Sequence, residues 1–253
     1  MKLSTKDIAL ICVLAAIYYI TSILPGVPIV GIPQPKIELE ATMASVFGVI
    51  AGPYLGFLAG FLGAILAWTL PPGSASFTSA PFLLNPAINA LTTGLILQST
   101  RVSSKFRNTS GWLAAFIILG VLNVAFWFTP VSQPIDQYYY VAVLATFDKV
   151  TAWLLILPIV KFAERLSSSR GRLLVFFFLL AFIGNQADSA LGVLVFALPP
   201  VYAWIFQLPV DTVRWLYVVS PFYYPIIRLL QALLATFIIV PLVEALKGRG
   251  WPI

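Results

Sequence analysis

The segment IELEATMASVFGVIAGPYLGFLAGFLGAILAWTL, residues 37–70, carries no charged side chain after Glu40. About 20 apolar residues are enough for one helix to cross a bilayer, and this segment is longer. Gly52-Pro53 interrupts it, and a proline inside a helix removes a hydrogen bond and clashes with the preceding turn. We therefore expect two membrane helices, residues 37–51 and 53–70, with a reversal at Gly52-Pro53, rather than one long helix.

Hydropathy and helix breakers predict eight spans along the chain. They cover residues 7–24, 37–51, 53–70, 82–97, 111–128, 138–160, 173–198 and 222–246. The expected fold is an all-α integral membrane protein, a bundle of about eight transmembrane helices in a single transmembrane domain, residues 1–253.

The composition excludes a water-soluble domain. Hydrophobic residues make up 60% of the 253 residues, charged residues only 9%, and the mean hydropathy is +0.96. An ordinary soluble domain carries about 25% charged residues. The N-terminal apolar run is followed by Leu24-Pro25-Gly26 with no small-x-small cleavage site, so we expect an uncleaved first helix rather than a signal peptide.

Lysine and arginine residues indicate the orientation, because loops rich in these cations stay in the cytoplasm. With eight spans and both termini cytoplasmic, eleven of the 15 cations lie inside. Lys36 and Arg214 lie outside, and Lys149 and Arg228 lie within spans. Fusing the hairpin into one helix would move Arg101 and its neighbours outside, which favours the hairpin. The net charge of +6 therefore follows membrane topology and does not indicate nucleic acid.

Small and polar residues recur at helical spacing in the first hundred residues. Gly48, Gly52, Gly56 and Gly60 are four residues apart, a pattern that lets helix backbones approach closely in lipid. Asn85, Asn89, Thr92 and Thr93 share one face of the fourth span. Lipid satisfies no amide group, so this face must point inward, either for hydrogen bonds between helices or to line a solute pocket.

Four ionisable residues inside spans give the strongest functional signal. Asp148, Lys149, Asp188 and Arg228 would each cost about 2.5–3.5 kcal/mol at a helix centre, so they must pair or face a wet cavity. Polar neighbours share their helix faces. These neighbours are Asn185, Ser189 and Gly192 on the seventh span, and Tyr224 and Gln231 on the eighth.

Two interpretations of these residues remain open. Two acids and two bases balance, so they can form structural ion pairs. Alternatively, they line a site open to the outside, in which Arg228 holds a carboxylate or carbonyl of a solute and Asp188 and Asn185 bind its polar edges. By this second interpretation the substrate-binding residues are Asn85, Asn89, Asp148, Lys149, Asn185, Asp188, Tyr224, Arg228 and Gln231.

Missing residue types weigh against catalysis. The chain has no histidine and one cysteine, so a metal or haem site built from ordinary ligands is not expected. No Gly-x-x-x-x-Gly-Lys run is present to bind nucleotide phosphates, and a Ser-His pair is impossible. We expect no catalytic residues, no metal and no cofactor, and hence no enzyme.

The first hundred residues resemble a known transporter family. A basic N-terminus precedes a first helix rich in small residues, a Pro-rich loop, the entry Lys36-Ile37-Glu38-Leu39, a helix ending in Gly52-Pro53 and then Tyr54-Leu55-Gly56-Phe57-Leu58-Ala59-Gly60. This pattern resembles the substrate-binding S components of energy-coupling factor (ECF) vitamin transporters. Their usual six-helix core would carry two extra helices here.

The resemblance implies a module in the cell membrane that binds a vitamin or related micronutrient from outside. Such a module docks on a transmembrane coupling protein driven by two ATPases, and the family docks through small residues four apart on the first helix. Cys12 and Ala16 match that spacing, with Cys12 in place of the usual alanine. The loop from Pro25 to Lys36 would correspond to the gate over the site.

Two other functions remain as alternatives. In an ion-coupled secondary transporter, Asp148 and Asp188 would be the coupling sites. A membrane-embedded lipid-modifying enzyme would need positioned acid and base groups or a metal. An S component binds its solute without accumulating it alone, whereas a secondary transporter accumulates it under an ion gradient.

Overall fold

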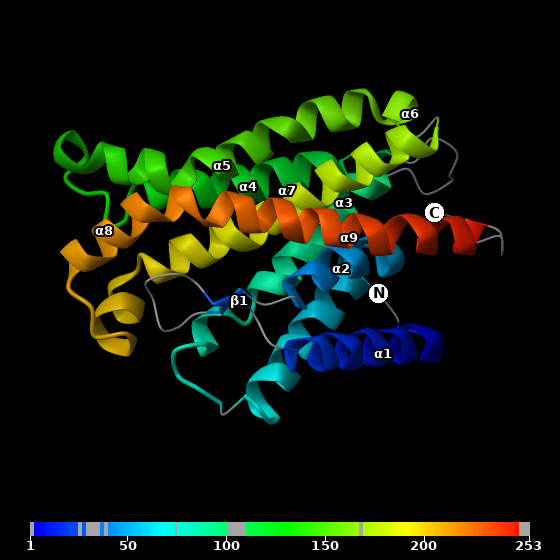
Figure 1. Ribbon diagram of the computed structural model, residues 1–253, viewed down its shortest axis with the longest axis horizontal. Coiled ribbons are helices and arrows are strands. Elements are labelled where there is room, and N and C mark those ends of the chain that lie inside the picture. Colours follow the sequence, from blue (N-terminus) through cyan, green and yellow to red (C-terminus); the bar gives the residue numbers. More distant parts are fainter. Residues whose placement is uncertain are drawn as a thin grey trace.

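The computed structural model describes residues 3–24, 27–28, 36–37, 40–73, 75–100, 110–166 and 169–247. Within these ranges the chain is almost entirely helical (Figure 1). The elements are α1 (Thr5–Ser22), β1 (Val27–Pro28), β2 (Lys36–Ile37), α2 (Glu40–Thr69), η1 (Ala80–Phe82), α3 (Asn85–Thr100), α4 (Gly111–Phe126), α5 (Ile135–Lys161), α6 (Ala163–Leu166), α7 (Arg170–Phe196), η2 (Pro200–Ile205), α8 (Val210–Val219), η3 (Ser220–Phe222) and α9 (Tyr224–Lys247). β1 and β2 pair as a short antiparallel ladder.

The chain reverses within α2, at the predicted position. Gly52 has φ 78° and ψ −178°, a left-handed conformation that glycine adopts without steric cost. A methyl group on Gly56 would lie 3.0 Å from the carbonyl oxygen of Phe47. In a straight helix these two residues would be about 13 Å apart along the axis. α2 is therefore a hairpin of residues 40–51 and 53–69, and the predicted reversal is confirmed.

Glycines let three backbones pack closely around this hairpin. Built methyl groups at Gly60 and Gly94 would lie 3.0 Å from the Pro86 carbonyl oxygen and 2.5 Å from the Pro53 nitrogen. These contacts join α3 to the second arm, and a methyl group on Gly48 of the first arm would meet the Ala90 backbone, so α3 crosses both arms at backbone contact. Without a hydrophobic drive between helices in lipid, such close packing is what holds them together.

α7 is the central helix of the bundle. It contacts α2, α3, α4, α5 and α9, and every residue from Leu180 to Ala190 is buried. A helix that is apolar on most of its circumference is expected to be surrounded by other helices. The polar residues in this buried stretch, including Asn185 and Asp188, therefore meet protein rather than lipid.

α1 packs at the edge of the bundle against α2. Ile11, Leu14, Ala15 and Tyr18 form its buried face, and the opposite face is exposed. Figure 1 shows both labelled termini in the right half of the view, N beside α1 and C at the end of α9, with α8 at the far left. A second apolar cluster closes the α8 end and includes Phe126, Val141, Val213 and Tyr217.

Six helical segments are long and apolar enough to cross a membrane. They are Thr5–Ser22, Glu40–Thr69, Ala80–Thr100, Ile135–Lys161, Arg170–Phe196 and Tyr224–Leu246. The described part of the chain is thus a multi-pass membrane bundle of helices, with one short β ladder. Each of the eight predicted spans overlaps a helix, but two of them form the α2 hairpin, which starts at Glu40, and α4 has only 16 residues. The count of eight spans and the cytoplasmic side of the termini stay predictions.

Candidate functional site

Buried amide and hydroxyl groups join α2, α3 and α7 at mid-bundle. Asn89 Nδ2 donates to Asn185 Oδ1 at 2.9 Å, and the Ser45 hydroxyl donates to Asn89 Oδ1 at 2.8 Å. The Thr93 hydroxyl also donates to Asn89 Oδ1, at 3.3 Å. Gly184 leaves the room for this cluster, because a methyl group there would collide with Thr93 and Asn89 side-chain oxygens. Asn89, on the predicted inward face of α3, therefore forms hydrogen bonds to α2 and α7.

Arg228 extends these contacts from α7 to α9. We call the row Ser45, Asn89, Asn185, Asp188 and Arg228 the polar line. Its Nη2 donates to Asp188 Oδ1 at 3.2 Å and its Nη1 to Gln231 Oε1 at 3.0 Å. Asn185 Nδ2 donates to the Arg228 carbonyl oxygen at 3.4 Å, which links the ion pair to the asparagine cluster. The Arg228 and Asp188 side chains are only 13% and 7% exposed. A buried pair of this kind is stable only while both members remain.

Two buried polar atoms beside this line lack a hydrogen-bond partner among the residues described. They are Arg228 Nε and Asn85 Oδ1. Asn85 begins α3 and lies against Gly192 of α7, where a methyl group would come within 2.8 Å of Asn85 Nδ2. An unsatisfied buried polar group costs about 1–3 kcal/mol. A donor and an acceptor thus remain available on the α8 side of the Asn89–Asn185 contact.

Asp148 and Lys149 form a second buried ion pair, on α5. Lys149 Nζ lies 2.8 Å from Asp148 Oδ1, and the two side chains are 4% and 5% exposed. Asp148 Oδ2 has no hydrogen-bond partner within the described ranges. Arg228 is close enough to Lys149 for their positive charges to repel each other. The four ionisable residues singled out in the sequence are therefore neighbours that pair acid with base.

Two tyrosines lie beside the polar line at the α8 end. Tyr224, one turn before Arg228, is partly buried and lies within electrostatic range of that arginine. Tyr217 of α8 donates its hydroxyl to the Val193 carbonyl oxygen at 2.7 Å. Burial, and to a smaller degree Tyr224, raises the pKa of the Tyr217 phenol well above its usual value. The phenol therefore stays neutral and acts as a fixed donor to α7.

The structure adds residues that the sequence did not single out. Ser45 connects α2 to both asparagines, yet one serine in an apolar run gives no periodic signal. Gln186 is fully buried, and neither of its amide atoms has a partner in the described part of the chain. Its place beside Asn185 in the polar segment Asn185-Gln186-Ala187-Asp188-Ser189 of α7 was a usable signal.

Arg214 fixes the α8 end of the molecule. Its guanidinium donates to the carbonyl oxygens of Val131, Pro130 and Gln133 at 3.0, 3.2 and 2.9 Å. The same group stacks 3.4 Å from the Tyr138 ring centroid. Five donors in a planar fork suit this arrangement, which a lysine would not reproduce. The predicted outside cation therefore ties α8 to the loop before α5.

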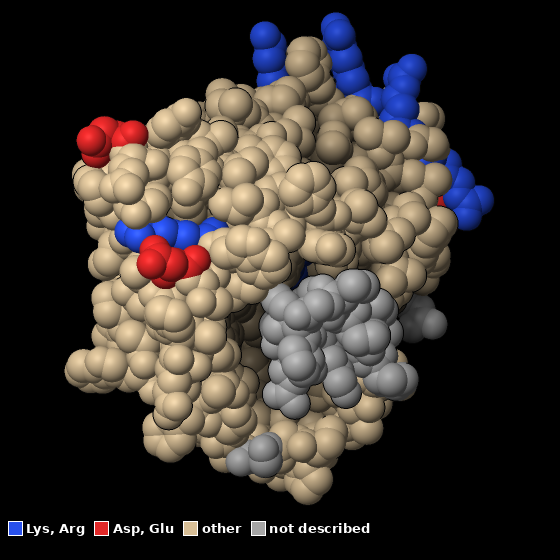
Figure 2. Space-filling model, turned by 60° about the vertical axis from the view of Figure 1, so that its left-hand side comes forward, with Lys and Arg blue, Asp and Glu red and all other residues tan. Residues whose placement is uncertain are grey.

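The α8 end of the molecule carries few charges. Figure 2 brings this end forward and shows a mostly uncharged surface, with most Lys and Arg side chains gathered along its upper right margin. The visible face is hollowed beside the grey residues. This distribution agrees with the uneven partition of cations in the sequence.

Other sequence predictions fall on different parts of the chain. Cys12 and Ala16 are both exposed on the outward face of α1, and Cys12 is a free thiol. The predicted gate, Pro25 to Lys36, lies outside the described residues except at β1 and Lys36. Over the described ranges, no three His, Cys, Asp or Glu side chains gather as metal ligands do.

Comparison with known proteins decides the family. The profile of the family described as "ECF-type riboflavin transporter, S component" matches residues 2–164, more than half of the chain. The chain belongs to this S-component family. S components are transporter subunits, so membership supports a role in membrane transport rather than catalysis.

One curated relative is also similar to this S component. A UPF0397 protein of Lactobacillus johnsonii is 29% identical over 125 residues, which cover 49% of this chain and 65% of the relative. The chain therefore spans slightly less than two thirds of that relative's length. No solved structure matches the chain.

The family match and the polar line overlap only in part. Asn85, Asn89, Asp148 and Lys149 lie within the matched residues, whereas Asn185, Asp188 and Arg228 lie beyond residue 164. The ion pair between α7 and α9 therefore lies outside the residues that match the family, and only the structure of this chain supports it.

Proposed function

We propose that this S component captures a small, water-soluble, vitamin-like nutrient from outside the cell. Uptake would then be driven by a separate transmembrane coupling protein and ATPase subunits. The observation that carries the proposal is the buried Arg228–Asp188 pair, with Arg228 Nε left without a partner among the described residues. Asn85 Oδ1 is likewise unpartnered in that part of the chain, and Asn85 packs on Gly192, one turn beyond Asp188 on α7. Family membership supports the transport role.

The chemistry of these groups favours a solute that has carbonyl or carboxylate oxygens beside an N–H donor. An oxygen of the solute would accept a hydrogen bond from Arg228, and its N–H would donate to Asn85. Tyr224, partly buried next to Arg228, suits a planar ring. Riboflavin is the first compound to test, since the matched family is named for it and its ring has such a polar edge.

Depth in the bundle supports an opening on the α8 side. Arg228 lies four residues from the start of α9, or about 6 Å along the helix. Asp188 lies eight residues before the end of α7, or about 12 Å. If the cation-rich end is cytoplasmic, as we expect, the proposed site lies in the outer half.

The test uses the full chain purified alone and reconstituted in nanodiscs. Native mass spectrometry would look for a retained small molecule, and titration with riboflavin and a panel of other vitamins would look for saturable binding. We expect binding of one solute at a 1:1 ratio. The proposal fails if no compound in the panel and no co-purified molecule binds.

Transport assays separate this proposal from an ion-coupled carrier. Asp148 Oδ2 is buried without a partner among the described residues, which is the observation that favours the alternative. In liposomes under a proton or sodium gradient, the S component should bind its solute but not accumulate it. Accumulation by the chain alone would favour the ion-coupled carrier.

A further inference from the structure

A groove of about 450 Å³ lies between the end of α5, α6 and the start of α7. It lies at the opposite end of the molecule from α8, where Figure 1 draws α6 at the right. Ligand pockets commonly measure about 300–1,000 Å³, so this groove has the volume of a binding site. It plays no part in the polar line around Arg228.

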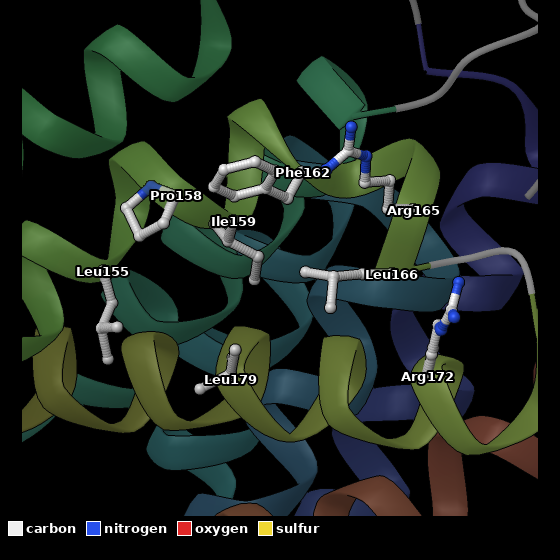
Figure 3. A pocket seen from close by; sticks show the side chains of 8 residues that line it. All are labelled: Leu155, Pro158, Ile159, Phe162, Arg165, Leu166, Arg172 and Leu179. Carbon is white, nitrogen blue, oxygen red and sulfur yellow. The ribbon is translucent and has the colours of Figure 1, made fainter.

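The groove is lined by apolar side chains at one end and by arginines at the other. Figure 3 shows Leu155 and Leu179 at one end and Arg165 and Arg172 at the other. The two arginines come from α6 and α7, so they approach the groove from its two sides. Pro158 and Phe162 are both exposed, which opens the groove to the outside of the bundle.

The arginine end of the groove is strongly cationic. Lys161 Nζ and the Arg165 guanidinium carbon lie 5.6 and 5.9 Å from the centroid of the Phe162 ring. Glu164 of α6 is the acidic neighbour in this stretch. Arg170 pairs with Glu244 of α9 at 3.4 Å and is absent from the groove lining.

We propose that the groove binds one anionic phospholipid. The phosphate would lie between Arg165 and Arg172, and an acyl chain would pack on Leu155, Ile159 and Leu179. Guanidinium groups bind phosphate oxygens in pairs, and basic pockets between transmembrane helices recognise anionic headgroups. The apolar end of the groove matches the acyl chain of such a lipid, and the end with two arginines matches its phosphate.

A protein partner is the competing occupant of this surface. The exposed small-residue face suited to helix docking is on α1, however, and Figure 1 places α1 and α6 on opposite margins of the bundle. The division of the groove into one apolar and one cationic end favours lipid. The lipid site is also independent of the nutrient proposed above.

The test measures lipid adducts on the delipidated full chain by native mass spectrometry. Phosphatidylglycerol and phosphatidylcholine with the same acyl chains would be titrated separately. We expect one phosphatidylglycerol to bind at least about tenfold more tightly than phosphatidylcholine. Each cationic contact near a membrane contributes about a fivefold effect, so R165Q/R172Q should weaken phosphatidylglycerol binding about 25-fold.

Two controls make the test specific. Arg170→Gln removes the same charge at the same end and should change lipid binding less than about threefold. Leu179→Trp fills the apolar end and should weaken binding with both arginines intact, which covers the case that R165Q/R172Q fails to fold. Soluble glycerol phosphate should not compete, because it lacks the acyl chains.

Three results would overturn the lipid site. Equal binding of the two lipids would remove the headgroup specificity, and an equal loss in Arg170→Gln would indicate a general charge effect. The third is that the groove variants keep their lipid adducts but lose co-purification with coupling and ATPase subunits. That result would assign the groove to a protein partner.

Discussion

Arg228 of α9 and Asp188 of α7 meet across 3.2 Å inside the bundle, with both side chains largely shielded from solvent. Removing one member of a buried ion pair leaves an uncompensated charge and costs about 3–5 kcal/mol, whereas removing both is often neutral. The pair therefore holds α7 to α9.

This coupling predicts how the two residues respond to substitution. Arg228→Gln alone should lower the free energy of unfolding by about 3 kcal/mol, since Asp188 is left buried and charged. The double variant D188N/R228Q should recover most of that loss. Chemical unfolding in detergent would measure both, and equal loss in the single and double variants would contradict the pairing.

The asparagine cluster predicts that two buried asparagines contribute differently to the stability of the fold. Asn89→Leu removes the hydrogen bonds to Asn185 and Ser45 and should cost about 1–2 kcal/mol of stability. Asn123 donates only to Leu119 of its own helix, and its Oδ1 has no partner in the described residues. Asn123→Leu should therefore be nearly neutral in the same unfolding assay. Comparable losses would show that Asn89 has no special role between helices.

Because α2 and α3 are in backbone contact, adding one methyl group between them should lower the stability of the fold. Gly48→Ala would place Cβ against the Ala90 carbonyl oxygen and 3.0 Å from Thr93 Cβ. Because a backbone atom cannot swing away, we expect a loss of about 1–3 kcal/mol. Gly171 has nothing within 4 Å of a built methyl group. Gly171→Ala should cost nothing, and thermal unfolding midpoints would show whether the two variants differ.

The exposed face of α1 predicts where partner subunits dock. Ala16→Trp should abolish co-purification with the coupling protein and ATPases, because a large ring prevents close helix approach, while solute binding is kept. Val121 of α4 is 60% exposed on another helix. Val121→Trp is therefore the matched control and should leave the complex intact. Loss of the complex in both variants, or in neither, would exclude docking through this face.

Much of the helix layout follows from local sequence signals. Gly52-Pro53 predicts the hairpin because proline interrupts a helix locally, and the partition of Lys and Arg over the loops favours the same reversal. The spacing of Asn85, Asn89 and Thr93 predicts the inward face of α3. Helix α8 was missed, since its ten residues, which include Asp211 and Arg214, are too short for a hydropathy signal.

The partners of the buried charges depend on tertiary packing. Lys149 pairs with its neighbour Asp148, although adjacent residues do not face each other on a helix, because the long lysine side chain turns back. Arg228 and Asp188 are 40 residues apart, and no sequence period connects them. The sequence identifies these residues because a charged group in lipid is costly, but it does not show which acid pairs with which base.

The most direct test of solute capture is the binding affinity of the D188N/R228Q double variant for the solute identified with the unaltered chain. Calorimetry or native mass spectrometry in nanodiscs would measure it beside Asn123→Leu as a folded control. If Arg228 and Asp188 hold the solute, affinity falls at least about 100-fold in the folded double variant and stays within about threefold in the control. Unchanged affinity in the double variant would contradict a solute site between α7 and α9.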